Sequence, residues 1–218
     1  MNKKEYVEFI DDPKHLINPP RDFILFDAPY LEVFSKTPWY AIPIMWLPIV
    51  YMLASSCELW MPLAIGVFVF GLASWTLLEY TLHRFLFHCE DRLPDHPFVL
   101  TAHFLIHGVH HAFPMDRYRL VFPIVPGYTL GSIIYFLFSL VLPGAMLDVF
   151  FAGIIIGYIG YDMTHYWVHH MSARWERARY LKRYHMAHHY KDWDNGYGIT
   201  NDFWDSVFGT KIKLDKEA

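Results

Sequence analysis

Residues 145–170 read AMLDVFFAGIIIGYIGYDMTHYWVHH and contain no lysine or arginine. The first part, Ala145–Tyr161, is apolar and approaches the roughly 20 residues that a helix needs to cross a lipid bilayer. The second part carries His165 and His169, which share one face of a helix because they are four positions apart. This stretch therefore predicts a transmembrane helix that ends in two histidines on a common face.

The charge distribution extends the membrane prediction to a second region. Two parts of the chain, 37–83 and 120–173, lack lysine and arginine, and polar and turn residues interrupt each near its middle. We therefore expect an all-α integral membrane protein with four transmembrane helices in two hairpins, at about 39–82 and 120–166. The first pass is short and contains Pro43 and Pro48, so a kinked, tilted or partly interfacial helix is expected there.

The positive charges set the expected orientation. All 18 lysines and arginines lie in 1–36, 84–119 and 174–216, which two hairpins would bring to one side of the membrane. The positive-inside rule makes that side cytosolic, with both chain termini. Two buried hairpins of a soluble helical protein, the alternative, do not account for such one-sided charge.

The predicted hairpins divide the chain into two parts. We expect 39–218 to form one membrane domain whose cytosolic helical cap consists of 83–119 and 167–218. Residues 1–38 are expected to form a cytosolic segment that packs on this cap, because Phe23–Phe26 is apolar amid charged residues. A segment that lies in the membrane interface is the alternative.

The overall composition excludes several classes of protein. Hydrophobic residues make up 54% of the chain, which argues against disorder, and two cysteines cannot build a disulfide framework or a four-thiolate zinc site. A net charge of −4 lacks the excess of positive charge that is typical of nucleic-acid-binding proteins, so no nucleic-acid partner is expected. The 14 histidines are far more than a chain of this length usually has, and they indicate a metal site.

Ten of these histidines fall into four groups: His83 and His88; His107, His110 and His111; His165 and His169; His185, His188 and His189. Positions i, i+3 and i+4 share a helix face, so each three-histidine group is expected to present its imidazoles to a common point. The first pair is five positions apart, about 140° on an α-helix, so it either flanks one metal or serves two. All ten are expected to converge at the membrane–cytosol boundary.

Ten nitrogen ligands are too many for one ion, so the sequence predicts two metals with four or five imidazoles each. Imidazole suits iron, zinc, copper and nickel, which leaves the metal open. Glu79 and Asp162 are expected to accept the second ring N–H of nearby histidines and to fix their orientation, with ordinary boundary acids as the alternative. The remaining histidines are expected not to be ligands: His15, His96, His103 and His170.

At this point the chain is identified as similar to the membrane fatty acid hydroxylase superfamily, and most closely to the fatty acid 2-hydroxylases, over roughly residues 20–210. The strings that carry the resemblance are FSKTPWY at 34–40, LLEYTLHRFLFH at 77–88, HFLIHGVHH at 103–111, RLVFPIVP at 119–126, GYDMTHYWVHH at 160–170, HMAHH at 185–189 and GYGIT at 196–200. The resemblance implies an endoplasmic reticulum enzyme that uses O2 to hydroxylate C2 of a fatty acyl chain, mostly in sphingolipids such as ceramide. The family's ten ligand histidines match the ten grouped above.

The resemblance also implies cofactors and partners. Two iron ions are expected for activity, and zinc is expected to be able to replace them in purified protein. Electrons are expected from cytochrome b5 and its NAD(P)H reductase. Many family members carry a cytochrome b5 domain with a His-Pro-Gly-Gly motif; this sequence has no such motif, so a separate donor and no haem are expected. Tyr161 and Asp162 are candidates for holding the substrate head or supporting the metal shell.

Three other functions fit parts of this pattern. A desaturase or sterol oxidase uses similar histidine groups and would be separated by its products. A zinc carrier is disfavoured, because carriers place coordinating groups near the bilayer midplane and these histidines gather at one boundary. A structural metal protein without turnover would be stabilised by metal but would consume no O2.

Overall fold

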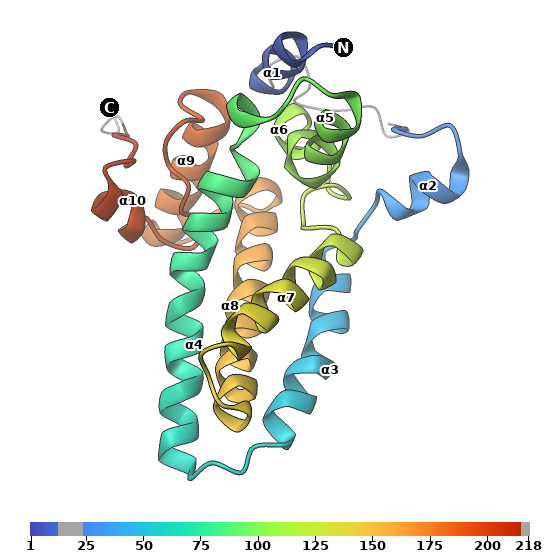
Figure 1. Cartoon of the computed structure of the whole chain (residues 1–218). Coiled ribbons are helices and arrows are strands. Elements are labelled where there is room, and N and C mark those ends of the chain that lie inside the picture. The colour runs from blue at the N-terminus through green and yellow to red at the C-terminus, as the bar shows by residue number, and fades with distance from the viewer. Residues whose placement is uncertain (13–23, 215–218) are drawn as a thin grey trace.

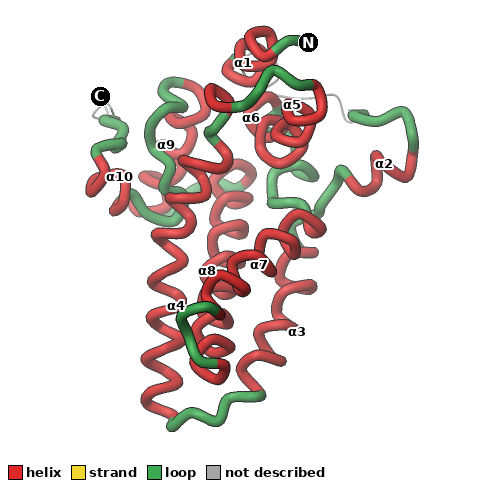
Figure 2. Tube along the Cα trace, viewed as in Figure 1, coloured by secondary structure: helices red, strands yellow, loops and turns green. Residues whose placement is uncertain are grey.

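The structure is a computed structural model that describes residues 1–12 and 24–214. These residues form helices and connecting loops, and no β-strand occurs among them (Figure 2). The elements are α1 (Lys3–Asp11), α2 (Pro29–Phe34), α3 (Ala41–Ser55), α4 (Met61–Leu82), the π-helix η2 (His83–Phe87), the 3-10 helix η3 (Glu90–Arg92), α5 (Pro97–His103), the π-helix η4 (Phe104–Gly108), α6 (Val109–Ala112), α7 (Ile124–Ser139), α8 (Gly144–His170), α9 (Glu176–Tyr190) and α10 (Phe203–Phe208).

Helices α3, α4, α7 and α8 form a bundle, and the shorter helices gather at one end of it (Figure 1). Helix α8 runs through the middle and contacts α3, α4 and α7. In the apolar stretch of α8, 61% of the residues are buried, whereas in that of α4 only 17% are. Helix α8 is therefore the core of the bundle, and α4 lies on its outside. The loops after α3 and α7 lie at the end of the bundle away from the short helices.

Within the described residues, two helical stretches are long and apolar enough to cross a membrane. They are Met61–Phe87, which is α4 with η2, and Gly144–His170; each has 27 residues and contains an 18-residue apolar stretch, with a mean hydropathy of 1.9 and 1.6 respectively. Helices α3 and α7 have 15 and 16 residues, or about 23 Å at 1.5 Å per residue, against a hydrocarbon core of about 30 Å. The all-helical membrane class is therefore supported, and the count of four passes stays a prediction.

Small residues let α4 and α8 approach closely. A Cβ atom added at Gly153 would overlap the carbonyl oxygen of Phe68, and one added at Gly71 would overlap the carbonyl oxygen of Phe150. Glycine at these positions allows backbone-to-backbone contact, as in many helix pairs within membranes. This contact matters for the site because α4 leads into His83 and α8 carries the histidines at its end.

The short helices form a cap over one end of the bundle, comprising α1, η2 to α6, α9 and α10 (Figure 1). Helix α1 packs on it through Tyr6 and Ile10, both 1% exposed, and Tyr6 Oη lies 2.5 Å from Nδ1 of His103. The apolar residues 23–26 are expected from the sequence to pack on the cap. Leu25 packs against the buried cluster that contains Tyr6 and Ile10, whereas Ile24 is 61% exposed and Phe23 lies outside the described residues.

Candidate metal centre

Five histidines meet where α8 enters the cap, and we call them the α8 cluster: His110, His165, His169, His185 and His189. All five are buried, and one nitrogen from each lies within 4.8 Å of the others. The Nε2 atoms of His165 and His110 are 2.9 Å apart, and those of His185 and His169 are 2.8 Å apart. Nε2 atoms this close point at a common centre, which is the arrangement of imidazoles around a metal ion.

Four more histidines form the α4 cluster: His83, His88, His107 and His111. His188 joins its edge, because its Nε2 lies 3.1 Å from Nε2 of His88 and its ring centre lies 4.9 Å from that of His83. The Nε2 atoms of His83 and His111 are buried and have no hydrogen-bond partner in the described part of the protein. Such orphaned acceptors fit a bound cation better than an ordinary polar core.

The two three-histidine groups divide between the clusters, so the expectation of one common point for each group is wrong. His107 and His111 belong to the α4 cluster, whereas His110 between them belongs to the α8 cluster. His185 and His189 likewise join the α8 cluster, whereas His188 faces His88. Neighbouring residues point about 100° apart on a helix, which is enough to aim adjacent rings at two centres.

A local change of helix type explains why His83 and His88 lie in the same cluster. Residues His83–Phe87 form a π-helix, and the N–H of His88 donates to the carbonyl of His83 at 3.0 Å. A hydrogen bond from i+5 to i closes a wider turn, so a residue five positions on returns to nearly the same face. The 140° separation expected for an α-helix therefore does not apply, and the pair serves one cluster.

The buried histidines outside the candidate membrane spans favour their neutral form. Burial lowers the pKa of His188 to about 4 and holds the pKa values of His110 and His111 well below the ordinary value. Neutral imidazole is the form that offers a lone pair to a metal. The chemistry and geometry of both clusters therefore fit two metal ions.

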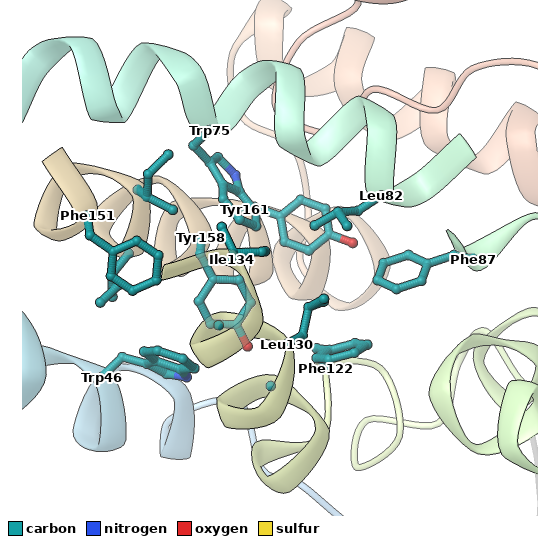
Figure 3. Close-up of a pocket in the computed structure, with 14 residues that line it drawn as sticks. Trp46, Trp75, Leu82, Phe87, Phe122, Leu130, Ile134, Phe151, Tyr158 and Tyr161 are labelled. Atoms are coloured by element: carbon teal, nitrogen blue, oxygen red, sulfur yellow. The ribbon is translucent and has the colours of Figure 1, made fainter. Parts of the chain in front are cut away.

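An apolar pocket lies between the bundle helices, and aromatic and aliphatic side chains line it (Figure 3). Figure 3 shows Leu82, Phe87 and Tyr161 at one end, and Phe151 at the other. At the first end, the Phe87 ring stacks on that of His107 of the α4 cluster, with ring centres 4.9 Å apart. The ring centre of Tyr161 lies 5.8 Å from that of His165 of the α8 cluster. One apolar pocket thus ends beside both clusters.

Comparisons with known proteins agree with this geometry. A family model described as fatty acid hydroxylase matches residues 68–210. The ceramide very long chain fatty acid hydroxylase scs7 of Schizosaccharomyces pombe is 46% identical over 190 residues, which cover 86% of this chain and 55% of that protein. The chain belongs to the fatty acid hydroxylase family.

Two further comparisons concern a plant relative and a solved structure. The dihydroceramide fatty acyl 2-hydroxylase FAH2 of Arabidopsis thaliana is 42% identical over 210 residues, 95% of this chain and 86% of that protein. A solved structure of full-length scs7p, in which only the hydroxylase domain is visible, matches with a TM-score of 0.88 at 38% identity, over 98% of this chain and 80% of that chain. The chain spans about half the length of the Schizosaccharomyces pombe relative and most of the Arabidopsis one.

Glu79 and Asp162 do not accept a hydrogen bond from a histidine in the described structure, which corrects the expectation for both. Glu79 accepts from the backbone N–H groups of Ile199 and Thr200, at 2.7 and 2.8 Å. Asp162 accepts from the N–H of Phe122 at 3.3 Å. Both carboxylates lie about one helical turn from a histidine in the sequence. Each nevertheless accepts hydrogen bonds from another segment, Glu79 from 199–200 and Asp162 from Phe122.

The histidine partners that the structure does show are backbone carbonyls of a loop after α9. Nδ1 of His83 lies 2.6 Å from the carbonyl oxygen of Tyr197, and Nδ1 of His188 lies 2.7 Å from that of Asn195. Sequence reasoning missed these partners because any residue has a carbonyl. Only the unusual GYGIT string at 196–200, which contains two glycines, marked this loop as special.

The histidines expected not to be ligands lie outside both clusters where they are described. His103 contacts Tyr6 through Nδ1 and the carbonyl oxygen of Phe87 through Nε2 at 2.7 Å, so both ring nitrogens have protein partners. The His170 ring packs on Tyr166, and His96 is exposed at the start of α5. His15 lies outside the described residues.

Proposed function

We propose that this protein inserts a hydroxyl group at C2 of a fatty acyl chain, with ceramide or a related sphingolipid as substrate. The observation that carries the proposal is the apolar pocket whose end lies against both histidine clusters, through Phe87 and Tyr161. The names of the relatives support the reaction and the substrate class, because they include fatty acid 2-hydroxylases and ceramide hydroxylases.

The ten histidines of the two clusters are proposed to hold two metal ions, iron in the active enzyme and zinc where zinc replaces it. Iron with O2 supplies the oxidising power that removal of hydrogen from an unactivated CH2 group requires, which no acid or base side chain provides. The protein supplies neutral imidazoles, buried surroundings and a fixed separation of the two centres, and these are set by η2, η4, α6, α8 and α9, which carry or adjoin the ten histidines.

The pocket residues are proposed to bind and orient the acyl chain. Its aromatic and aliphatic walls bury methylene groups and exclude water, at a gain of about 0.8 kcal/mol per buried CH2. Tyr161 lies on the wall beside the α8 cluster, where it can guide the chain to the metals. Asp162 ties α8 to Phe122, another wall residue, so we propose that it positions this wall.

The membrane setting of the enzyme is part of the proposal. We propose four passes in two hairpins in the endoplasmic reticulum membrane, with the cap, the metal site and both termini in the cytosol. Residues 1–38 would form the segment on the cap and 39–218 the hydroxylase domain. Electrons would come from a separate cytochrome b5 and its NAD(P)H reductase. The one-sided positive charge and the position of the cap at one end of the bundle support this orientation.

The test is lipid mass spectrometry of cells that lack their own 2-hydroxylase and that receive this chain with a cytochrome b5 donor. We expect 2-hydroxy acyl sphingolipids to rise with the wild-type chain, to be absent with His188→Ala and to persist with His96→Ala, whose exposed side chain lies outside both clusters. Desaturated lipids or oxidised sterols without 2-hydroxylated lipids would move the enzyme to another reaction. Full activity of His188→Ala would contradict its assignment as a ligand.

The pocket predicts control of acyl-chain length. Ile134 on α7 lines the pocket, whereas its neighbour Ile133 is 51% exposed on the outside. Ile134→Trp is expected to fill part of the pocket and to shift the hydroxylated products to shorter acyl chains. Ile133→Trp adds the same bulk outside the pocket, so it should leave the product lengths unchanged. The measurement is the chain-length profile of the 2-hydroxylated lipids; equal shifts in both variants would contradict this role of the pocket.

A further inference from the structure

We propose that residues 195–200, which we call the strap, orient two histidines of the α4 cluster and make that metal position the tighter of the two. The inference rests on the two-metal site proposed above. The strap follows α9 and passes beside the C-terminal end of α4, where it contacts His83 and His188. The strap contains the carbonyl groups of Tyr197 and Asn195, which are the hydrogen-bond partners of these two rings.

The strap sets the protonation of both rings. A carbonyl oxygen only accepts hydrogen bonds, so Nδ1 of His83 must donate to Tyr197 and Nδ1 of His188 must donate to Asn195. With hydrogen on Nδ1, the Nε2 of each neutral ring carries the free lone pair, and that atom faces the α4 cluster. Such hydrogen bonds fix the tautomer and the ring orientation of a ligand, and they raise its basicity.

Two buried carboxylates hold the strap in place. Asp205, which is 0% exposed, accepts from the N–H of Tyr197 at 2.9 Å and from that of Gly198 at 2.8 Å. Glu79 accepts from the next two N–H groups, those of Ile199 and Thr200. Four consecutive backbone donors therefore end on carboxylate oxygens. This pattern fixes the direction of the Tyr197 carbonyl between them, and so we assign a positioning role to both acids.

The backbone of the strap depends on its two glycines. Gly196 has a φ of +76°, a conformation that side-chain-bearing residues rarely adopt. A Cβ atom on Gly198 would overlap the carbonyl oxygen of Asn201 and would lie 2.8 Å from Oδ2 of Asp205. The close approach of Asp205 to two successive N–H groups is therefore possible only with glycine at 198.

The α8 cluster has no comparable support. Nδ1 atoms in this cluster are buried without a hydrogen-bond acceptor in the described parts of the chain, at His110, His169, His185 and His189. Packing of α6, α8 and α9 brings these rings together, but within the described residues no carbonyl or carboxylate accepts a hydrogen bond from the Nδ1 atoms of these four histidines. We therefore expect the α8 cluster to bind its metal more weakly and to release it faster.

The experiment measures zinc release from purified, zinc-loaded protein after addition of an excess of chelator. Wild-type protein is expected to release two ions in two phases, one slow and one fast. Asp205→Asn keeps the size of the side chain but turns one acceptor oxygen into an amide that opposes a backbone N–H. We expect it to speed the slow phase by about 10–100-fold and to leave the fast phase unchanged.

Asp202→Asn is the matched control. Asp202 lies three residues away, and its carboxylate bonds Tyr180 at 2.7 Å and Lys211 at 2.5 Å and also pairs with Arg177, none of which belongs to the strap. The same Asp-to-Asn change there should leave both phases as in the wild type. If Asp202→Asn speeds the slow phase as much as Asp205→Asn does, a general loss of stability explains the effect and the strap proposal is overturned.

Two further variants assign the phases and do not depend on the folding of Asp205→Asn. His107→Ala is expected to speed the slow phase, because His107 lies in the α4 cluster, and His189→Ala is expected to speed the fast phase. The reverse assignment, or a single phase for both ions, would overturn the inference. Wild-type protein that binds no zinc and no iron would overturn the proposed function itself, which separates the failure of one proposal from that of the other.

Discussion

Replacing His110 with alanine is expected to weaken metal binding at the α8 cluster, and replacing its neighbour His111 is expected to weaken it at the α4 cluster. The reason is that the two adjacent rings serve different centres: a ring nitrogen of His110 groups with those of the α8 cluster, whereas one of His111 groups with those of the α4 cluster. Each variant should lose at least about 100-fold in hydroxylation, more than the change expected for a residue that only orients a ligand.

Double variants distinguish this division from a single shared site. His110→Ala with His189→Ala changes one cluster only, so one tightly bound metal should remain per protein. His110→Ala with His111→Ala changes both clusters, so no tightly bound metal should remain. The measurement is metal content by elemental analysis after dialysis against a weak chelator, with His96→Ala as the control. Equal metal loss in the two double variants would show that the clusters do not act as separate sites.

Gly153→Ala is expected to destabilise the protein strongly, although it adds only one methyl group. The added Cβ would overlap a backbone oxygen of α4, and backbone atoms cannot move aside as a flexible side chain can. The helices must separate, at a cost of roughly 3 kcal/mol, the upper part of the usual range for overpacking, which corresponds to a Tm lowered by roughly 6–12 °C. Hydroxylation should fall as well, because α4 and α8 lead into different histidine clusters.

Gly160→Ala is the matched control on the same helix. Gly160 is exposed, and a Cβ atom there would meet nothing within 4 Å. Alanine favours a helix by about 0.5–1 kcal/mol over glycine, so the Tm should stay the same or rise slightly. The test is thermal unfolding of both variants in the same detergent, followed by the hydroxylation assay. If Gly153→Ala melted at the wild-type temperature, the close contact of α4 and α8 would not be what sets their separation.

Several features of this protein could be predicted from local patterns. The apolar stretches 37–83 and 120–173 predict helices in a membrane because twenty apolar residues leave the backbone no other way to satisfy its hydrogen bonds there. The spacing of His165 and His169 predicts a shared face because the helix repeat is fixed. The number of histidines predicts two metals because one ion cannot accept ten ligands. Each of these inferences depends on geometry within one helix or on simple counting.

Other features could not be read from local patterns. The π-helix at His83–Phe87 brings His83 and His88 into one cluster, where the sequence left open whether they serve one metal or two, and nothing in HRFLFH marks this helix type. The prediction that each three-histidine group shares one point failed because which ring faces which centre depends on the helices packed on either side. The expected hydrogen bonds from histidines to Glu79 and Asp162 are absent from the described structure because the partners of these acids, at 199–200 and 122, are far away in the sequence.

The sequence by itself thus determined the helical membrane class and the set of ten histidines, because these follow from composition and from the helix repeat. Only the tertiary structure decided how the ten divide into two clusters, which carbonyls orient His83 and His188, and where the pocket ends. The physical reason is that most of these features arise from contacts between segments about 20 to 120 residues apart in the chain. Such contacts depend on close packing, to which glycines such as Gly153 contribute as much as the ligands do.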